Sequence, residues 1–346
     1  MSGASEADQE SRALWAEEVG SPAPKVDGIW NYIITADDAE REQALLNDFP
    51  ASGGIKVHGL FNEVLPAVLC GAGGLAREYP DGNLKRYAVL CVPRSGSRYL
   101  VSVLNRHGLG MPEEHLREPL GAAIADGRLP FRKSFKELER FGQRNGVFGT
   151  KLISSFLIRA CNGRLQRIEQ NIGWMAQRGF QFVYLDRPLN ESVISNYIAA
   201  RIKKWHFFEQ LDDTTKDILD KLEFNEDAAW SEYIRFRAQK LTLAYLAQTF
   251  HMPAISYTSL QESVESVVSA LGTRLNVDPA ALKGGSAAVP VPTRKESDTY
   301  ANFSGALSDV LETRKHEITP YTEKMLRELV GVDKETAEHL AATPIP

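Results

Sequence analysis

The sequence of 346 residues contains only three cysteines, Cys70, Cys91 and Cys161. Three scattered cysteines are too few for a disulfide framework or a four-ligand zinc site. The sequence also has no excess of positive charge, because 40 lysine and arginine residues stand against 45 aspartate and glutamate residues. The net charge of −5 argues against a nucleic-acid-binding protein, which needs a basic surface. This charge is compatible with one small anionic ligand held by a few local cations.

Long apolar runs are absent as well. No run approaches the ~20 residues that a transmembrane helix needs, so we expect no integral membrane segment. The first 20 residues are polar and acidic and lack the basic and apolar regions of a secretory signal. Hydrophobic residues make up 43% of the chain and charged residues 25%, as in globular proteins. These features predict a cytoplasmic globular protein and favour an enzyme.

The apolar pattern predicts an α/β protein. Four short, mainly apolar runs fit buried strands, at residues 86–92, 147–153, 181–186 and 253–257. Helical spacing of apolar residues follows the first, third and fourth runs, and a further helix is expected at about 227–249. Thr258 and Gln261 have the spacing of a capping box at the last helix. Strands that alternate with helices predict a parallel sheet flanked by helices on both faces.

The loop at residues 93–97 (PRSGS) joins the first expected strand to a helix. Such a junction directs backbone N–H groups and the positive end of a helix at one point, which favours an anion. Arg94 adds a guanidinium group, and two serines add hydroxyl donors. The chain lacks the Gly-Lys-Ser/Thr of the Walker A motif of ATPases, and the turn lacks the G-x-G-x-x-G of dinucleotide-binding proteins. A Cys-x5-Arg phosphatase loop that started at Cys91 would need arginine at the position where this sequence has Ser97. An ordinary turn filled with polar residues is the alternative.

A second cationic position follows the third expected strand. Arg187 comes directly after this strand, and Ser195 follows eight residues later on the next helix. Ligands of open α/β sheets bind outside the carboxyl ends of the strands, so Arg187 and the loop at 93–97 should face one crevice. Ser195 lies about two helical turns along and could contact the same phosphate. Alone, it could equally be a solvent-facing serine.

Together these features resemble the sulfotransferase family that uses 3′-phosphoadenosine 5′-phosphosulfate (PAPS), and most closely its bacterial trehalose 2-sulfotransferase branch. The PRSGS loop is similar to the 5′-phosphosulfate loop of the family, and the Arg187 to Ser195 spacing is similar to its 3′-phosphate motif. Four more segments match the branch in order: GLGMPEEHL (108–116), GTKL (149–152), AARIKKWHF (199–207) and PTRKESDTY (292–300). The resemblance covers about residues 86–310, and residues 1–85 have no counterpart.

The resemblance implies a P-loop-like sulfotransferase fold and in-line transfer of a sulfuryl group from PAPS to a carbohydrate or glycolipid hydroxyl, leaving 3′-phosphoadenosine 5′-phosphate (PAP) and needing no metal. The implied donor-binding residues are Pro93, Arg94, Ser95, Gly96, Ser97, Arg98, Arg187, Ser195, Arg294 and Lys295. Glu114 is the implied general base, and the implied acceptor-binding residues are Glu113, Lys151, Trp205 and His206. Simpler readings stay open: helix-start carboxylates for the two glutamates, surface charges for Lys151, Arg294 and Lys295, and a core residue for Trp205.

The resemblance also divides the chain into a tail (1–25), an N-terminal accessory segment (26–85), a sulfotransferase domain (86–315) and a C-terminal helical tail (316–346). The branch is dimeric, and the accessory segment is rich in apolar residues, so we expect a homo-oligomer. Two other functions stay open. One is a non-catalytic nucleotide-binding or interaction protein on the same fold. The other is a P-loop nucleotide kinase, which the missing Gly-Lys-Ser/Thr disfavours.

Overall fold

A computed structural model describes residues 84–110, 112–117, 120–143, 146–202, 213–277 and 298–345. The expected tail and the accessory segment up to residue 83 lie outside the described residues. Trp205, His206, Arg294 and Lys295 also lie outside them. Within the described residues, no helix has both the length and the apolar character that crossing a membrane requires.

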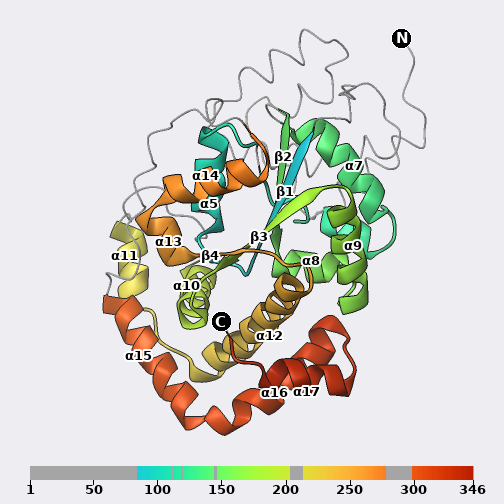
Figure 1. Ribbon diagram of the computed structural model, residues 1–346. Helices are drawn as coiled ribbons and strands as arrows, with labels where there is room; N and C mark the ends of the chain where they lie inside the picture. The colour runs from blue at the N-terminus through green and yellow to red at the C-terminus, as the bar shows by residue number, and fades with distance from the viewer. Residues whose placement is uncertain are drawn as a thin grey trace, which may run out of the picture.

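Four parallel strands form the sheet, in the order β2-β1-β3-β4 (Figure 1). They are β1 (Lys85–Cys91), β2 (Val147–Ile153), β3 (Phe180–Asp186) and β4 (Ala254–Ser256). Cys91 of β1 lies opposite Ile153 of β2 and Leu185 of β3, so the carboxyl ends of these strands lie level with one another. All four expected strands are confirmed, and β4 is shorter than expected. The parallel sheet flanked by helices confirms the α/β class.

Alternate residues of β1 enter two separate cores. Tyr87, Val89 and Cys91 pack on one face, while Ala88 and Leu90 pack on the other. The first face is covered by α5 (Ser97–Arg106), α13 (Tyr257–Glu262) and α14 (Val264–Arg274). The second core includes residues of α6 (Leu120–Ala125), α7 (Phe131–Gly142), α8 (Ser154–Ala160), α9 (Leu165–Gln177), α10 (Leu189–Ile202) and α12 (Glu226–Thr249). Helices on both faces explain why the strands are apolar along their whole length.

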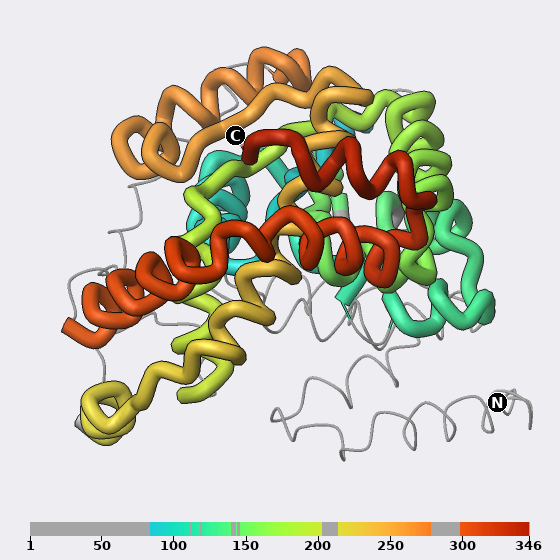
Figure 2. Tube along the Cα trace, turned by 90° about the horizontal axis from the view of Figure 1, so that it is seen from below, coloured from blue at the N-terminus to red at the C-terminus, as the bar shows by residue number. Residues whose placement is uncertain are grey.

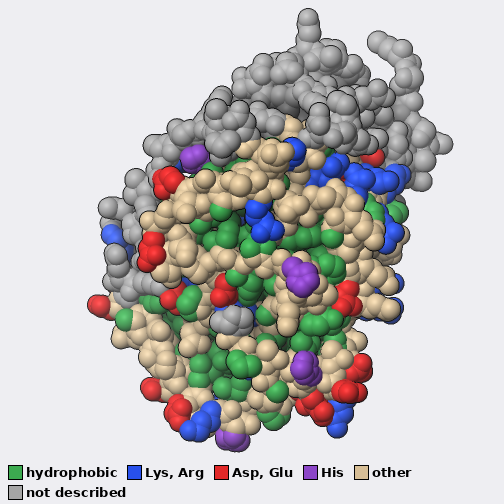
Figure 3. All heavy atoms as spheres, viewed as in Figure 1, with side chains coloured by type: hydrophobic (Ala, Val, Ile, Leu, Met, Phe, Trp, Pro, Cys, Tyr) green, Lys and Arg blue, Asp and Glu red, His purple; other side chains and the backbone are tan. Residues whose placement is uncertain are grey.

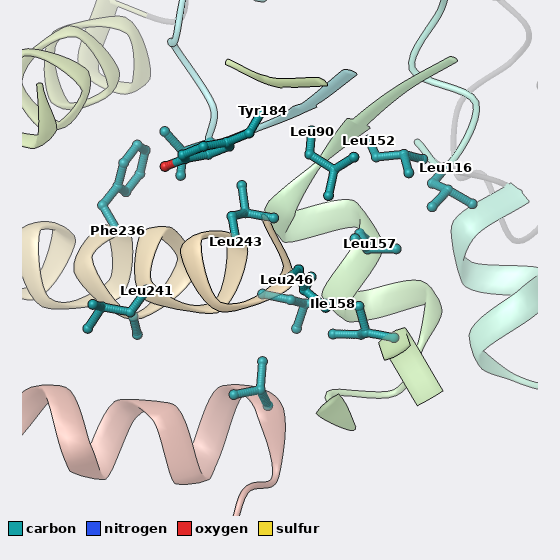
Figure 4. Packing of buried hydrophobic residues seen from close by; sticks show 14 of the residues in the cluster. Leu90, Leu116, Leu152, Leu157, Ile158, Tyr184, Phe236, Leu241, Leu243 and Leu246 are labelled. Atoms are coloured by element: carbon teal, nitrogen blue, oxygen red, sulfur yellow. The ribbon is translucent and has the colours of Figure 1, made fainter. Parts of the chain in front are cut away.

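Helix α12 forms the centre of the second core and confirms the helix expected at 227–249. It begins after Asn225, whose side chain accepts a hydrogen bond from the amide of Ala228 at 2.8 Å. Figure 4 shows Leu243 and Leu246 of this helix facing Leu90 of β1. The other sides of α12 pack against α10 and the C-terminal helices, so it is buried around most of its circumference.

The remaining helices lie outside this layer. They are α11 (Asp213–Asp220), α15 (Asp298–Thr313), α16 (Lys315–Val330) and α17 (Lys334–Ala342). Helices α16 and α17, red in Figure 2, pack against α12. They bury Leu326, Val330 and Leu340 in the same core as the sheet. The helical character expected for the C-terminal residues is therefore confirmed.

The expected capping box at Thr258 was wrong. Strand β4 ends at Ser256, whose hydroxyl accepts a hydrogen bond from the amide of Ser259 at 2.9 Å. Ser256 is therefore the cap, and α13 begins at Tyr257, so Thr258 already lies in its first turn. The apolar stripe that follows belongs to two helices, α13 and α14, which are separated at Ser263. Because β4 ends earlier than expected, the residue that caps the next helix lies two positions earlier than the sequence predicted.

Candidate functional site

The loop between β1 and α5 makes a sharp turn at the carboxyl edge of the sheet. Arg94 and Gly96 both have left-handed backbone conformations, with φ values of 63° and 84°. Gly96 occupies the N-cap position of α5, and no side chain caps that helix. A helix that begins without a side-chain cap has amide N–H groups suited to an anion. The loop therefore has the local structure that the sequence predicted.

Ser95 gives this loop an unsatisfied polar group. Its side chain is fully buried, and its hydroxyl has no hydrogen-bond partner among the described residues. A buried hydroxyl without a partner costs roughly 1–3 kcal/mol. Ser97, at the start of α5, is also buried. Oxygen atoms of an anion in the loop would satisfy such hydroxyls, so the residues present fit the phosphosulfate group that the sequence implies.

Arg94 connects this loop to the end of β3 and to α10. Its Nε donates a hydrogen bond to Oγ of Ser195 at 3.1 Å. In return, Nη1 of Arg187 donates to the carbonyl oxygen of Arg94 at 2.8 Å. The structure thus brings together three residues that the sequence placed at one crevice. We call Arg94, Arg187 and Ser195 the donor cluster.

The electrostatics of the donor cluster favour an anion. Burial and, to a smaller extent, the positive charge of Arg187 together lower the pKa of Arg94 to about 10. Two neighbouring guanidinium groups repel each other, and a phosphate beside them would relieve that repulsion. Nε of Arg187 also donates to Oε2 of Glu191 at 3.1 Å. The cluster therefore combines fixed geometry with two neighbouring guanidinium groups, of which that of Arg187 is paired with a carboxylate.

Tyr257 is a residue of this site that the sequence reasoning missed. The guanidinium carbon of Arg187 lies 4.4 Å from the centre of its ring. The ring also covers Gly96, because a Cβ added there would lie 2.3 Å from Cε2 of Tyr257. Tyr257 is the first residue after β4, at the same edge of the sheet as Arg187. Its place directly after a strand was the signal that could have identified it.

A second cluster lies on the β2 side of the loop. The turn containing Glu113 and Glu114 joins the edge of β2, where the carbonyl oxygen of Glu113 accepts a hydrogen bond from the amide of Lys151 at 2.9 Å. Nζ of the buried Lys151 lies 2.6 Å from Oε1 of Glu114. Nη1 of Arg117 approaches the other oxygen of Glu114 at 4.0 Å. We call Glu113, Glu114 and Lys151 the carboxylate cluster.

The pKa shifts of several residues indicate electrostatic interactions between the carboxylate cluster and the neighbourhood of the loop. Burial raises the pKa of Glu113 to about 7, and Lys151 opposes this shift. Arg98, in the first turn of α5, interacts with both glutamates, although burial lowers its pKa overall. Burial likewise raises the pKa of the Cys91 thiol at the end of β1, and Lys151 opposes this rise. Arg98, expected among the donor ligands, therefore interacts electrostatically with the two carboxylates.

His115 holds the same turn against the sheet. Its Nδ1 is 2.9 Å from the hydroxyl of Thr150, and its ring stacks on Phe148 with 5.4 Å between ring centres.

Among the described residues, no group of three or more histidine, cysteine, aspartate or glutamate side chains could hold a metal ion. On the face in Figure 3, charged side chains of both signs are spread among apolar and polar ones. The preference for an anion is therefore a local property of the clusters.

Comparison with known proteins gives little further information. No protein-family model matches the chain, and no curated protein matches it. Among solved structures, the chain is similar to the sulfotransferase domain from the Synechococcus PCC 7002 olefin synthase. The sequence identity is 15%, the match covers 74% of this chain and 99% of that domain, and the TM-score is 0.33. A similarity at this level supports no inference about the activity of this chain.

Proposed function

We propose that this protein is a PAPS-dependent sulfotransferase that transfers a sulfuryl group to a hydroxyl of a carbohydrate or glycolipid. The observation that carries the proposal is the donor cluster: Arg94 bonds Ser195, and Arg187 bonds the loop that contains Arg94. This links the anion-binding loop to a second cationic position across the end of the sheet. A nucleotide with phosphate groups at both its 5′ and 3′ positions has the two separated anionic ends that such a site needs.

In the proposed complex, the loop binds the 5′-phosphosulfate. The buried hydroxyls of Ser95 and Ser97 and the backbone around Gly96 donate hydrogen bonds to its oxygens. Arg187 and Ser195 bind the 3′-phosphate. The Ser195 hydroxyl accepts from Arg94 and also carries a proton that it can donate to a phosphate oxygen. Charge-assisted hydrogen bonds of this kind are the strong ones in protein sites.

Sulfuryl transfer forms a bond between sulfur and the acceptor oxygen and breaks the bond between sulfur and the bridging oxygen of the 5′-phosphate. Negative charge builds up on the bridging oxygen as PAP leaves. Hydrogen-bond donors of the loop stabilise this charge, which is the largest contribution that a protein makes to such reactions. The proton of the acceptor hydroxyl passes to a carboxylate.

We assign that carboxylate to Glu114. Its ion pair with the ammonium group of Lys151, at 2.6 Å, favours the deprotonated form that a base requires. Lys151 is also placed to contact an oxygen of the sulfuryl group. Glu113 is the competing base, because its pKa of about 7 is well matched to proton transfer near neutral pH. Exchanging each carboxylate separately for an amide distinguishes the two.

Arg294 and Lys295 are proposed to cover the 3′-phosphate, and Trp205 and His206 to line the acceptor site. Support for the first pair comes from Tyr300, near the start of α15. Its hydroxyl donates to the carbonyl oxygen of Glu191 at 3.2 Å, and Glu191 is the ion-pair partner of Arg187. Helix α15, which begins four residues after Arg294, is therefore anchored beside the donor cluster. A homo-oligomer in the cytoplasm remains part of the proposal.

Calorimetric titration with PAP, adenosine 5′-monophosphate (AMP) and ATP tests the nucleotide. We expect PAP to bind about 10- to 100-fold more tightly than AMP, because only PAP has the 3′-phosphate. Tighter binding of ATP than of PAP would instead indicate a nucleotide kinase. Transfer of labelled sulfate from PAPS to a panel of sugars and glycolipids then tests catalysis. PAP binding without transfer to any acceptor would indicate the non-catalytic nucleotide-binding protein.

A further inference from the structure

Helix α12 contains one lysine, Lys240, and its side chain is buried in the interior of the protein with an exposed fraction of 1%. A buried ammonium group is costly unless it is paired and hydrogen-bonded. Nζ of Lys240 donates to the carbonyl oxygen of Arg187 at 2.9 Å and lies 2.8 Å from Oδ1 of Asp186. Its partners are thus two consecutive residues at the carboxyl end of β3. In the described structure, this ammonium group therefore binds two specific oxygen atoms at the carboxyl end of β3.

The first of these two contacts holds the backbone of Arg187. The guanidinium group of Arg187 is oriented by the carbonyl oxygen of Arg94, the carboxylate of Glu191 and the ring of Tyr257. Lys240 holds the main chain of the same residue. A binding group works best when neighbouring contacts fix its position before the ligand arrives. Lys240 supplies the contact that fixes the base of the Arg187 side chain.

The second contact, with Asp186, changes the charge next to the donor cluster. Asp186 is adjacent to Arg187 in the chain, and its carboxylate also accepts a hydrogen bond from the hydroxyl of Tyr184 at 3.2 Å. A negative charge so close to the donor cluster would repel a phosphate. The ammonium of Lys240 lies in direct contact with that carboxylate and offsets its charge.

The neighbouring residue of α12 makes a parallel contact with another strand end. Oε1 of Gln239 accepts a hydrogen bond from the hydroxyl of Ser154, directly after β2, at 2.6 Å. Gln239 is also buried, but it carries no charge and does not touch the donor cluster. Removing its amide therefore disturbs α12 and the sheet without altering the surroundings of Arg187. This makes Gln239 the matched control for Lys240.

We propose that Lys240 is a positioning residue for the 3′-phosphate of the donor nucleotide. It fixes the backbone of Arg187 and offsets the charge of Asp186, so that the donor cluster keeps its selectivity for a 3′-phosphate. This inference rests on the proposed function. A preference of the wild-type protein for PAP over AMP tests that function, and changes of this preference in variants test Lys240.

The experiment measures PAP and AMP affinity by calorimetry, together with the melting temperature, for three variants. Lys240→Met keeps the length of the side chain and removes the ammonium group, so the ratio of PAP to AMP affinity should fall about tenfold. Asp186→Asn keeps the shape and removes the negative charge, so the ratio should rise about threefold. Gln239→Leu should lower the melting temperature and leave the ratio at the wild-type value.

A wild-type ratio in folded Lys240→Met protein would overturn the proposal. So would an equal fall of the ratio in Gln239→Leu, because a general disturbance of α12 would then explain both results. If Lys240→Met does not fold, Asp186→Asn carries the test, since it is nearly isosteric with the wild type. An unchanged or lowered ratio in Asp186→Asn then rejects the role of Lys240. A wild-type protein that does not prefer PAP to AMP rejects the proposed function instead.

Discussion

The donor cluster and the carboxylate cluster lie on opposite sides of one loop, and they are built from opposite kinds of chemistry. In the donor cluster, two arginines lie close together, and the positive charge of Arg187 disfavours the charge of Arg94. In the carboxylate cluster, Glu114 is neutralised by Lys151 at 2.6 Å. An excess of like charge suits the binding of an anion. A balanced ion pair suits proton transfer, because small movements of the pair change the basicity of the carboxylate. From this difference we expect the donor cluster to bind the donor and the carboxylate cluster to activate the acceptor.

The two clusters also differ in how they are fixed. The donor cluster is held by a bond from Arg187 to the carbonyl oxygen of Arg94 and by a side-chain bond from Arg94 to Ser195. The carboxylate cluster is attached to β2 through the backbone of Glu113, while the side chain of Glu114 forms ion pairs with Lys151 at 2.6 Å and Arg117 at 4.0 Å. Substitutions in the donor cluster should therefore change nucleotide affinity. Substitutions in the carboxylate cluster should change the rate of transfer.

The largest effect is expected for Glu114→Gln. The amide keeps the shape of the side chain but cannot accept the acceptor's proton. Loss of a general base typically lowers kcat about 10²- to 10⁴-fold. The measurement is the rate of sulfate transfer to an active acceptor, together with PAP affinity, which should stay close to the wild-type value. Glu113→Gln is the control and should lower kcat far less. If Glu113→Gln has the larger effect, the base is Glu113.

Arg187→Ala should have the next largest effect, confined to nucleotides with a 3′-phosphate. The lost charge-assisted contact is worth roughly 1.5–3 kcal/mol, so PAP binding should weaken about 10- to 100-fold while AMP binding stays nearly constant. Calorimetry with both nucleotides checks this. Arg178→Ala is the matched control, because Arg178 bonds Glu139 near the amino-terminal end of β3. It should leave both affinities unchanged. Equal weakening of PAP and AMP by Arg187→Ala would remove the 3′-phosphate assignment.

Gly96→Ala should have a smaller effect, on both binding and stability. A left-handed conformation costs a residue with a side chain roughly 1–2 kcal/mol, and the new methyl group would also displace the ring of Tyr257. We expect about tenfold weaker PAP binding and a lower melting temperature. Gly179→Ala separates the two causes, because Gly179 has a φ of 82° but open space around the missing Cβ. It should lower stability without weakening PAP binding. Equal PAP affinities of the two variants would exclude a role for the Tyr257 contact.

Residues at strand ends could be predicted from the sequence, and residues on helices that dock from elsewhere could not. The loop at 93–97 and Arg187 each follow an apolar run directly, and parallel strands bring such residues to one edge of the sheet. Ser195 was predicted because helical geometry places it about two turns along the helix that follows Arg187 and because the Arg187 to Ser195 spacing resembles the 3′-phosphate motif. Lys240 lies 53 residues farther along the chain than Arg187, so its contact with Arg187 depends on how α12 packs. In the sequence, Lys240 follows Gln239 in a stretch that also contains Arg235 and Arg237, and this pattern is equally typical of a solvated face.

Burial explains the other differences between sequence and structure. The sequence places Glu113 and Glu114 side by side, but only the docking of their turn on β2 buries Glu113 and pairs Glu114 with Lys151. Arg98 follows the loop in sequence and is predicted to bind the donor, and in the structure it also interacts electrostatically with these carboxylates. Residue type and order thus predicted which groups gather, but their partners depend on tertiary packing.

The smallest effect concerns stability and pH. In the folded protein the pKa of Glu113 is about 7, against an ordinary value of 4.5, because burial disfavours the charged form. Between these two values the folded state binds this proton more tightly than the unfolded state does. The contribution of Glu113 to stability is therefore most favourable below pH 4.5 and is lost as the pH rises toward 7. Glu113→Gln, which stays neutral, should make the melting temperature less dependent on pH in this window. Glu262→Gln, at an exposed position of α13, should leave that dependence unchanged. Equal pH dependence of the melting temperature in wild-type and Glu113→Gln protein would show that folding does not raise the pKa of Glu113, and would remove the match to neutral pH that makes Glu113 the competing base.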